Sequence, residues 1–300
     1  MRRVSRMFGE NLFENEWDVA IIIDAASYEI LEELAEEYEY ITSVDARWSR
    51  GSKSNEWAQN TFIEDDVQLD DVNYVNGNAL SALVASGVHE KEFFHGGGPQ
   101  AWMVEHYLKN ELQQFNSHHP VWLKGRDGLV SDDEEFYIPS ESVTATALDV
   151  LDEYDGRTLV HYMQPHEPFI GASDRYSMWP YANGYSSLNM TDEDYNSVID
   201  AFTENHRLIL CELRKLLAEI DDELDVVVTA DHGNMYGRIA GVPYAFGHPE
   251  YIWFERNVRK VPYAHVDQSV VDETVDVEPP EDDEATPEEV VERLESLGYK

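Results

Sequence analysis

The stretch Val19-Ala20-Ile21-Ile22-Ile23-Asp24 is a run of five apolar residues that ends in a carboxylate. Two later stretches repeat the pattern: Thr158-Leu159-Val160 precedes His161, and Asp225-Val226-Val227-Val228-Thr229-Ala230 precedes Asp231-His232. Continuous runs of Val, Ile and Leu are typical of parallel strands buried on both faces. Because ligands bind outside the carboxyl ends of such strands, the sequence predicts a divalent-metal site built from Asp and His at that edge.

The segments between these runs predict how the rest of the chain is organised. Amphipathic or capped stretches predict helices at about 27–38, 140–154 and 192–220, and short apolar runs predict further strands at about 40–44 and 73–76. Strands that alternate with helices indicate an α/β fold, a doubly wound and mainly parallel sheet flanked by helices. We expect one catalytic domain over 1–266 with an irregular insert at about 90–140, an acidic linker at 267–285 and a short C-terminal helix at 286–300.

The charge of the chain is strongly negative. Asp and Glu number 61 against 21 Lys and Arg, which gives a formal net charge of −40. The acidic residues are spread over the whole chain, which favours a protein of a high-salt cytoplasm, as in halophilic archaea, over an acidic protein with a disordered tail. At about 1 M salt the Debye length falls to about 3 Å, so such a surface no longer repels itself strongly.

Composition also excludes several classes of protein. Without a basic stripe to meet phosphates, nucleic-acid binding is not expected. The single Cys211 excludes an intramolecular disulfide framework and a Cys-rich zinc site. No stretch approaches 18 apolar residues, and Met1-Arg2-Arg3 is not followed by the apolar core of a secretory signal. We therefore expect a cytoplasmic protein without a membrane span, of unknown oligomeric state.

Three polar clusters carry the candidate ligands. Asp231-His232-Gly233-Asn234 puts a carboxylate and an imidazole side by side at a strand end, and Gly233 would let the backbone turn sharply. The segment 161–168 holds His161 and His166, with prolines that fix the path between them. His248 follows Gly247 in a further polar loop. Each cluster taken alone is also compatible with an ordinary polar loop, so their significance lies in their combination.

Ser54 is the candidate nucleophile. It stands at the predicted start of a helix at 52–62, about thirty residues after Asp24. Free backbone N–H groups there favour an anion, and a nearby cation would lower the pKa of the hydroxyl. A plain helix-capping serine is the alternative, and Ser52 is a competing nucleophile. Lys53 or Arg50 could help to bind an anionic substrate.

Taken together, these segments resemble the alkaline phosphatase superfamily, specifically its sulfatase-like branch as found in haloarchaea. The resemblance rests on 23–26, 52–61, 161–168 and 229–234 in that order, and the ending 293–299 is also similar. It implies a divalent metal at the carboxyl edge of the sheet, with ligands matched by Asp24, Asp231 and His232 and a later His248 that can join a second ion. It also implies that Ser54 takes up the transferred group and that His166 contacts the ester oxygens. From the residues themselves, His161 and Lys53 are candidates for binding the substrate.

The chain departs from the sulfatase pattern at the nucleophile. Sulfatases of the formylglycine type carry Cys or Ser followed by x-Pro-x-Arg, and 52–56 has neither the Pro nor the Arg. This moves the expectation from sulfate toward phosphate esters. A His-bearing ligand set favours zinc or manganese over calcium, as one ion or two.

The expected function is therefore a metal-dependent hydrolase of phosphate or sulfate esters, acting on an anionic small molecule or a glycan ester. Two alternatives stay open. One is a transferase of the same superfamily that moves a phospho-head-group onto another acceptor. The other is a non-catalytic, metal-binding member of the superfamily, which the altered segment at 52–56 would permit.

Overall fold

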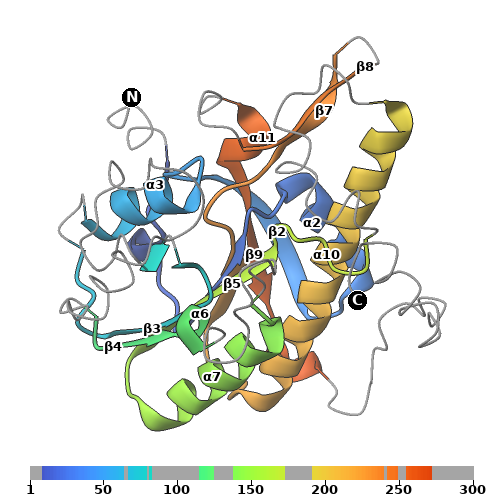
Figure 1. Ribbon diagram of the computed structural model, residues 1–300. Coiled ribbons are helices and arrows are strands. Elements are labelled where there is room, and N and C mark those ends of the chain that lie inside the picture. The colour runs from blue at the N-terminus through green and yellow to red at the C-terminus, as the bar shows by residue number, and fades with distance from the viewer. Residues whose placement is uncertain are drawn as a thin grey trace, which may run out of the picture.

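A seven-stranded sheet forms the centre of the protein, in the strand order β2-β9-β6-β1-β5-β3-β4 (Figure 1). The computed structural model describes residues 9–63, 67–79, 81–82, 115–124, 138–172, 191–239, 242–248 and 255–271. The strands of the sheet are β1 (Val19–Asp24), β2 (Ile41–Trp48), β3 (Val72–Asn76), β4 (Ser117–Pro120), β5 (Arg157–Pro165), β6 (Val226–Thr229) and β9 (Lys260–Val266).

The sheet is mainly parallel, as the sequence predicts. β6, β1, β5, β3 and β4 pair in parallel, whereas β9 runs antiparallel to both of its neighbours, β6 and β2. Because the five parallel strands point the same way, their carboxyl ends lie at one edge. β1 is central and pairs with β5 on one side and β6 on the other, so the three predicted ligand-bearing strands are neighbours.

Both faces of β1 are covered, which explains its unbroken apolar run. Val19, Ile21 and Ile23 pack into one core cluster, whereas Ala20 and Ile22 pack into the other. Successive side chains of a strand point to opposite faces. A strand between two helical layers therefore needs apolar residues at every position, and each of these five is fully buried. This confirms the predicted α/β fold.

Helices form the two outer layers. The larger core cluster contains residues of α2 (Tyr28–Leu34), α7 (Ser140–Glu153) and α10 (Asp192–Glu219), and the smaller one contains residues of α3 (Ser54–Ala58) and of the π-helical turn that continues it (Gln59–Ile63). The remaining elements are α6 (Val121–Lys124), α11 (Arg256–Arg259), a hairpin of β7 (Met235–Ile239) and β8 (Val242–Gly247), and 3-10 turns at Leu12–Glu14, Ala35–Glu37 and Gln268–Val270.

α10 is the longest helix and runs along the sheet beside α7 (Figure 1). A capping box starts it: the Thr191 hydroxyl accepts from the Asp194 backbone N–H at 3.1 Å, and the Asp194 carboxylate accepts from the Thr191 N–H at 3.1 Å. Such a cap satisfies two backbone donors that the first helical turn cannot pair. α10 therefore begins at Asp192, directly after the capping residue Thr191.

Several expected elements differ from those observed. The helix expected at 27–38 ends at Leu34 and continues as a 3-10 turn, and the strand expected at 40–44 extends from Ile41 to Trp48. The expectation of an irregular insert needs correction over 117–120, which form the edge strand β4. Its sequence Ser-His-His-Pro has no apolar periodicity, and an edge strand needs only one partner. The expected C-terminal helix at 286–300 and the linker beyond residue 271 lie outside the described residues.

Candidate active site and metal centre

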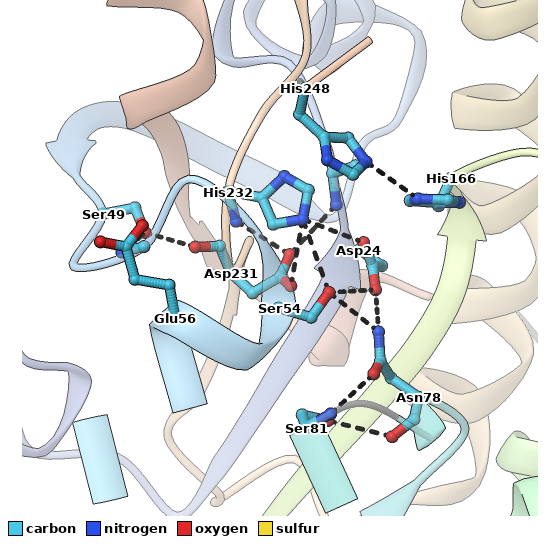
Figure 2. Close-up of polar contacts among 12 residues, drawn as sticks. Asp24, Ser49, Ser54, Glu56, Asn78, Ser81, His166, Asp231, His232 and His248 are labelled. Atoms are coloured by element: carbon cyan, nitrogen blue, oxygen red, sulfur yellow. Dashed lines mark hydrogen bonds and ion pairs between the residues drawn. The ribbon is translucent and has the colours of Figure 1, made fainter. Parts of the chain in front are cut away.

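The carboxyl ends of β1, β5 and β6 bring the predicted ligands together. β1 ends at Asp24, β5 contributes His161, and Asp231 and His232 follow β6. In Figure 2, the side chains of Asp24, Asp231 and His232 point toward one another. All four residues are fully buried. Residues more than 200 positions apart in the chain thus share one small volume, as the strand-end pattern predicts.

Asp24, His161 and Asp231 form a group that fits a metal ion. Each offers one ligand atom, and these atoms lie within 4.8 Å of one another. Among the described residues, no hydrogen-bond partner reaches Asp24 Oδ1, Asp231 Oδ2 or His161 Nε2, although all three atoms are buried. Buried polar atoms without partners cost stability, and two buried carboxylates need a positive charge nearby. A cation between them would satisfy both needs.

His232 presents a lone pair to the same place. Its Nδ1 lies 2.9 Å from the Gly233 carbonyl, which can only accept, so the Nδ1 carries the proton. When the imidazole is neutral, as a metal ligand must be, its Nε2 carries the lone pair and lies 3.6 Å from Asp24 Oδ1 and 3.6 Å from Asp231 Oδ2. This tautomer, fixed by the second nitrogen, is the one that binds metals. The geometry therefore suits the ligand role that the resemblance implies.

Asp24 is held as a carboxylate. Burial by itself would raise its pKa, but the side chain of His161 and the charges of His166 and His232 lower the pKa well below its usual range. His161 Nε2 lies 3.7 Å from Asp24 Oδ2. His161, expected to bind substrate, therefore lies among the candidate metal ligands.

Ser54 faces Asp24 and does not cap its helix. Its hydroxyl donates to Asp24 Oδ2 at 3.2 Å, and its Oγ lies 3.5 Å from His232 Nε2 (Figure 2). α3 begins at Ser54, and the N-cap residue is Lys53, which makes no side-chain cap. The capping-serine alternative is therefore wrong for Ser54. The helix has only five residues, so the expected help from its N-terminus is smaller than a long helix would give.

Ser52, the competing nucleophile, has a different role. Its hydroxyl and its backbone N–H both donate to Glu56 Oε2, at 2.8 and 2.9 Å. These bonds fix the loop that leads into α3. Gly51 lies in the same loop, and a Cβ there would come within 2.4 Å of the Trp57 backbone nitrogen. Close packing of the loop against α3 thus holds Ser54 in its position.

Asn78 and Ser49 complete the site and were not predicted. The Asn78 amide donates to Ser54 Oγ at 3.0 Å and also to Asp24 Oδ2. Ser49 donates its hydroxyl to the carbonyl of Asp231, and so joins the nucleophile loop to the end of β6. Because Asn78 lies just after the carboxyl end of β3, the strand-end pattern could have predicted it as a site residue. Ser49 directly follows β2, but the sequence indicated a strand ending at about residue 44, so this position was not recognised as a strand end.

His166, Glu167 and His248 form a second group of ligand atoms, also within 4.8 Å of one another. His166 Nε2 lies 3.1 Å from His248 Nε2. Burial would lower the pKa of His166, but the negative charges of Glu167 and Asp24 raise it to about 9. Burial lowers the pKa of His248 well below its usual range, helped by the charges of His232 and His166. An imidazolium at His166 can therefore donate to the neutral His248.

Two backbone features shape the metal loops. Ala25 has φ 59°, a left-handed conformation that is strained for residues other than Gly, and its N–H donates to Asp231 Oδ1 at 3.1 Å. Gly233 is required for a reason other than the predicted sharp turn. A Cβ at Gly233 would lie 2.2 Å from the carbonyl oxygen of Asn257, so close approach of two segments excludes a side chain there.

Lys53 and Arg50, the two basic candidates for binding an anionic substrate, have different surroundings. Lys53 precedes Ser54 and is half-buried, and its substrate-binding role stays a prediction. The guanidinium of Arg50 donates to the Asn60 carbonyl at 3.1 Å and pairs with Glu14 at 3.3 Å. Arg50 therefore supports the loop before Ser54. None of the helices in the described part of the chain is long and apolar enough to cross a bilayer.

Comparison with known proteins gives distant structural similarity. No protein-family model and no curated protein matches the sequence. The lipooligosaccharide phosphoethanolamine transferase EptA of Neisseria meningitidis, an integral membrane protein, is 11% identical with a TM-score of 0.49, and the match covers 87% of this chain and 49% of EptA. The zinc complex of the periplasmic domain of Escherichia coli EptC is 12% identical with a TM-score of 0.42, covering 86% of this chain and 75% of that domain.

Both solved structures are distant from this chain, with identities of 11% and 12%. They do not confirm the sulfatase-like branch that the motifs resemble. The chain spans about half the length of the Neisseria enzyme. Similarity at this level assigns neither an activity nor the role of any residue, so both have to come from the geometry of the site.

Proposed function

We propose that this chain is a metal-dependent enzyme that transfers the phosphate group of a phosphate ester through a covalent intermediate on Ser54. The orientation of the Ser54 hydroxyl carries the proposal: it donates to Asp24 at 3.2 Å and accepts from Asn78 at 3.0 Å, beside buried ligand atoms. A capping serine would accept from N–H groups of its own helix. A hydroxyl held by a carboxylate beside buried ligand atoms is instead placed where a bound cation would activate it as a nucleophile.

In the proposed reaction, Ser54 Oγ attacks the phosphorus atom, and the bond from phosphorus to the ester oxygen breaks. The proton of Ser54 passes to water as the attack proceeds, and the departing alkoxide takes up a proton from His166 or from water. An acceptor hydroxyl then attacks the phosphorus atom of the phosphoserine and gives its proton to His166 or to water. The bond from phosphorus to Ser54 Oγ breaks, and Ser54 Oγ takes up a proton from water. With water as the acceptor the enzyme is a hydrolase, and with an alcohol it is a transferase.

The candidate metal ligands support this chemistry. A divalent ion held by Asp24, Asp231 and His232 would lower the pKa of the serine hydroxyl and offset negative charge on the phosphate oxygens. Carboxylate with imidazole favours zinc or manganese over calcium. Asn78 orients the nucleophile, and the imidazolium of His166, whose pKa is raised to about 9, would place positive charge near the ester oxygens.

The identity of the acceptor, water or an alcohol, distinguishes the hydrolase from the transferase. The expected hydrolase is not confirmed, and the names of the similar solved structures, which are transferases, agree better with the alternative of phospho-head-group transfer. The first half of both reactions needs the same geometry around Ser54. Phosphate is proposed over sulfate because 52–56 lacks the sulfatase signature. The acceptor is therefore a question for product analysis.

The test is turnover of aryl phosphate monoesters and diesters and of aryl sulfates, in molar KCl, with zinc, manganese, magnesium or calcium supplied in turn. Each assay is run with and without a primary alcohol, and the products are separated to show whether water or the alcohol received the phosphate. We expect zinc- or manganese-dependent turnover of phosphate esters, reduced in S54A by about 1,000-fold or more. The matched control is S52A, which removes a hydroxyl two residues away and should retain turnover.

Three outcomes would contradict the proposal. Turnover of sulfate esters alone would refute the choice of phosphate. Full activity of S54A would refute the role of Ser54. Metal binding without turnover of any ester would favour the non-catalytic alternative.

A further inference from the structure

Two adjacent polar residues of α10 contact both segments that carry the candidate metal ligands. Asn205 and His206 are each fully buried in the middle of this helix, between the apolar Phe202 and Ile209. A buried amide or imidazole costs stability unless it is hydrogen-bonded, and an apolar residue would fill the same space without that cost. The partners of these two side chains therefore indicate what the residues do.

Asn205 holds the segment that carries His166 and Glu167. Its amide nitrogen lies 3.2 Å from the Pro165 carbonyl, 3.4 Å from that of His166 and 3.2 Å from that of Pro168. Its carbonyl oxygen accepts from the Ile170 N–H at 2.9 Å. The segment thus wraps around one amide, which pairs with backbone groups on both sides of the ligand residues.

His206 holds the segment that carries Asp24. Its Nδ1 lies 2.8 Å from the Phe202 carbonyl, so the Nδ1 carries the proton, and its Nε2 accepts from the Ser27 N–H at 3.1 Å. Ser27 is the N-cap of α2 and follows the strained turn at Ala25. The N–H of Ala25 in turn binds the Asp231 carboxylate. His206 therefore fixes the backbone between a ligand at the end of β1 and the helix that follows it.

We propose that Asn205 and His206 are positioning residues that set the distance between the Asp24 segment and the His166 segment, and so tune the affinity of the site for a divalent ion. This inference rests on the proposed function. Neither side chain offers a ligand atom to the site. They act through backbone groups. Asn205 and His206 are consecutive residues of one helix, and each holds one of the two segments by hydrogen bonds to its backbone.

The variants separate positioning from simple stabilisation of the fold. In H206Q the side-chain oxygen reaches about as far as the histidine Nε2 and can accept from Ser27, whereas in H206N it cannot. N205D keeps the shape of Asn205 but removes both N–H donors and faces three carbonyls with a carboxylate. T203V is the control on the same helix, since Thr203 donates only to the carbonyl of Ile199, within α10, at 2.8 Å.

The measurements are the affinity of purified protein for zinc or manganese by calorimetry, the absorption spectrum of bound cobalt(II), and urea unfolding of the metal-free protein. We expect N205D and H206N to bind the ion about 10- to 100-fold more weakly, as for other residues that orient metal ligands, with an altered cobalt spectrum. H206Q should restore most of the affinity, and T203V should bind as wild type. If N205D does not fold, the comparison of H206N with H206Q decides.

Wild-type affinity and an unchanged cobalt spectrum in folded N205D and H206N would overturn the inference, even if their unfolding midpoints fall. That result would leave the proposed function intact. Wild-type protein that binds none of these ions would overturn the proposed function, and this inference with it.

Discussion

The metal-free protein should lose stability between about pH 7.5 and pH 5, and about 2 kcal/mol of that loss should come from His206. Burial lowers the pKa of His206 from 6.5 to about 4, although the Phe202 carbonyl acts in the opposite direction. Between about pH 4 and pH 6.5, His206 is protonated in the unfolded chain but neutral in the folded protein. The contribution of His206 to the free energy of unfolding is therefore fully present above pH 6.5 and is lost as the pH falls toward 4. At about 1.4 kcal/mol per unit, the interval from 6.5 to 5 corresponds to about 2 kcal/mol.

The assay is urea unfolding of wild-type protein and H206Q across this pH range, with a chelator and molar KCl. Glutamine does not titrate and can still accept from Ser27, so the other titrating groups contribute equally to both proteins. The lower limit of pH 5 stays above the sequence pI of about 4.3, which keeps the net charge negative. We expect the advantage of wild type over H206Q to shrink by about 2 kcal/mol between pH 7.5 and pH 5.

A difference between the two proteins that does not change with pH would refute the reasoning. It would mean that His206 has the same pKa in the folded and unfolded states, and hence that its Nε2 is not a buried acceptor. A difference that grows as the pH falls would give the wrong sign and would indicate a protonated His206 in the folded protein.

Two further substitutions test the site. G233A should lower the free energy of unfolding by about 1–3 kcal/mol in urea titrations, because the new Cβ would lie 2.2 Å from the Asn257 oxygen. An unchanged unfolding midpoint would show that the backbone at Asn257 moves aside without cost. Y74F removes a hydroxyl that lies 3.1 Å from His161 Nδ1 and 3.0 Å from Ser81 Oγ. It should cost about 1 kcal/mol of stability and weaken zinc binding in calorimetry; unchanged affinity would argue against His161 as a ligand.

The sequence predicted best what depends on local pattern. The strands at 19–24, 157–165 and 226–229 were expected within a few residues, because each contains a run of buried apolar residues. The strand-end rule then placed Asp24 and Asp231 together without any knowledge of contacts. Ser54 was also singled out, at a predicted helix start about thirty residues after Asp24, and the structure places it beside Asp24. Its role as nucleophile stays a prediction.

β9 shows why other elements were missed. It runs between β6 and β2, yet its sequence Lys-Val-Pro-Tyr-Ala-His-Val contains a proline, which argues against an inner strand. In the structure, the carbonyl of Pro262 accepts from the Thr229 hydroxyl. β4 and the β7–β8 hairpin likewise lack an apolar alternation that could be recognised in the chain.

The sequence by itself determined the α/β class, the buried parallel strands β1, β5 and β6 and the Asp and His side chains that they carry. Periodicity and burial are properties of consecutive residues, and a strand end is defined within one segment. Only the tertiary structure decided that Asn78 orients Ser54, that Ser49 ties its loop to β6, and that α10 holds two ligand segments through Asn205 and His206. These contacts join segments up to 182 residues apart, and their geometry depends on how helices pack against the sheet.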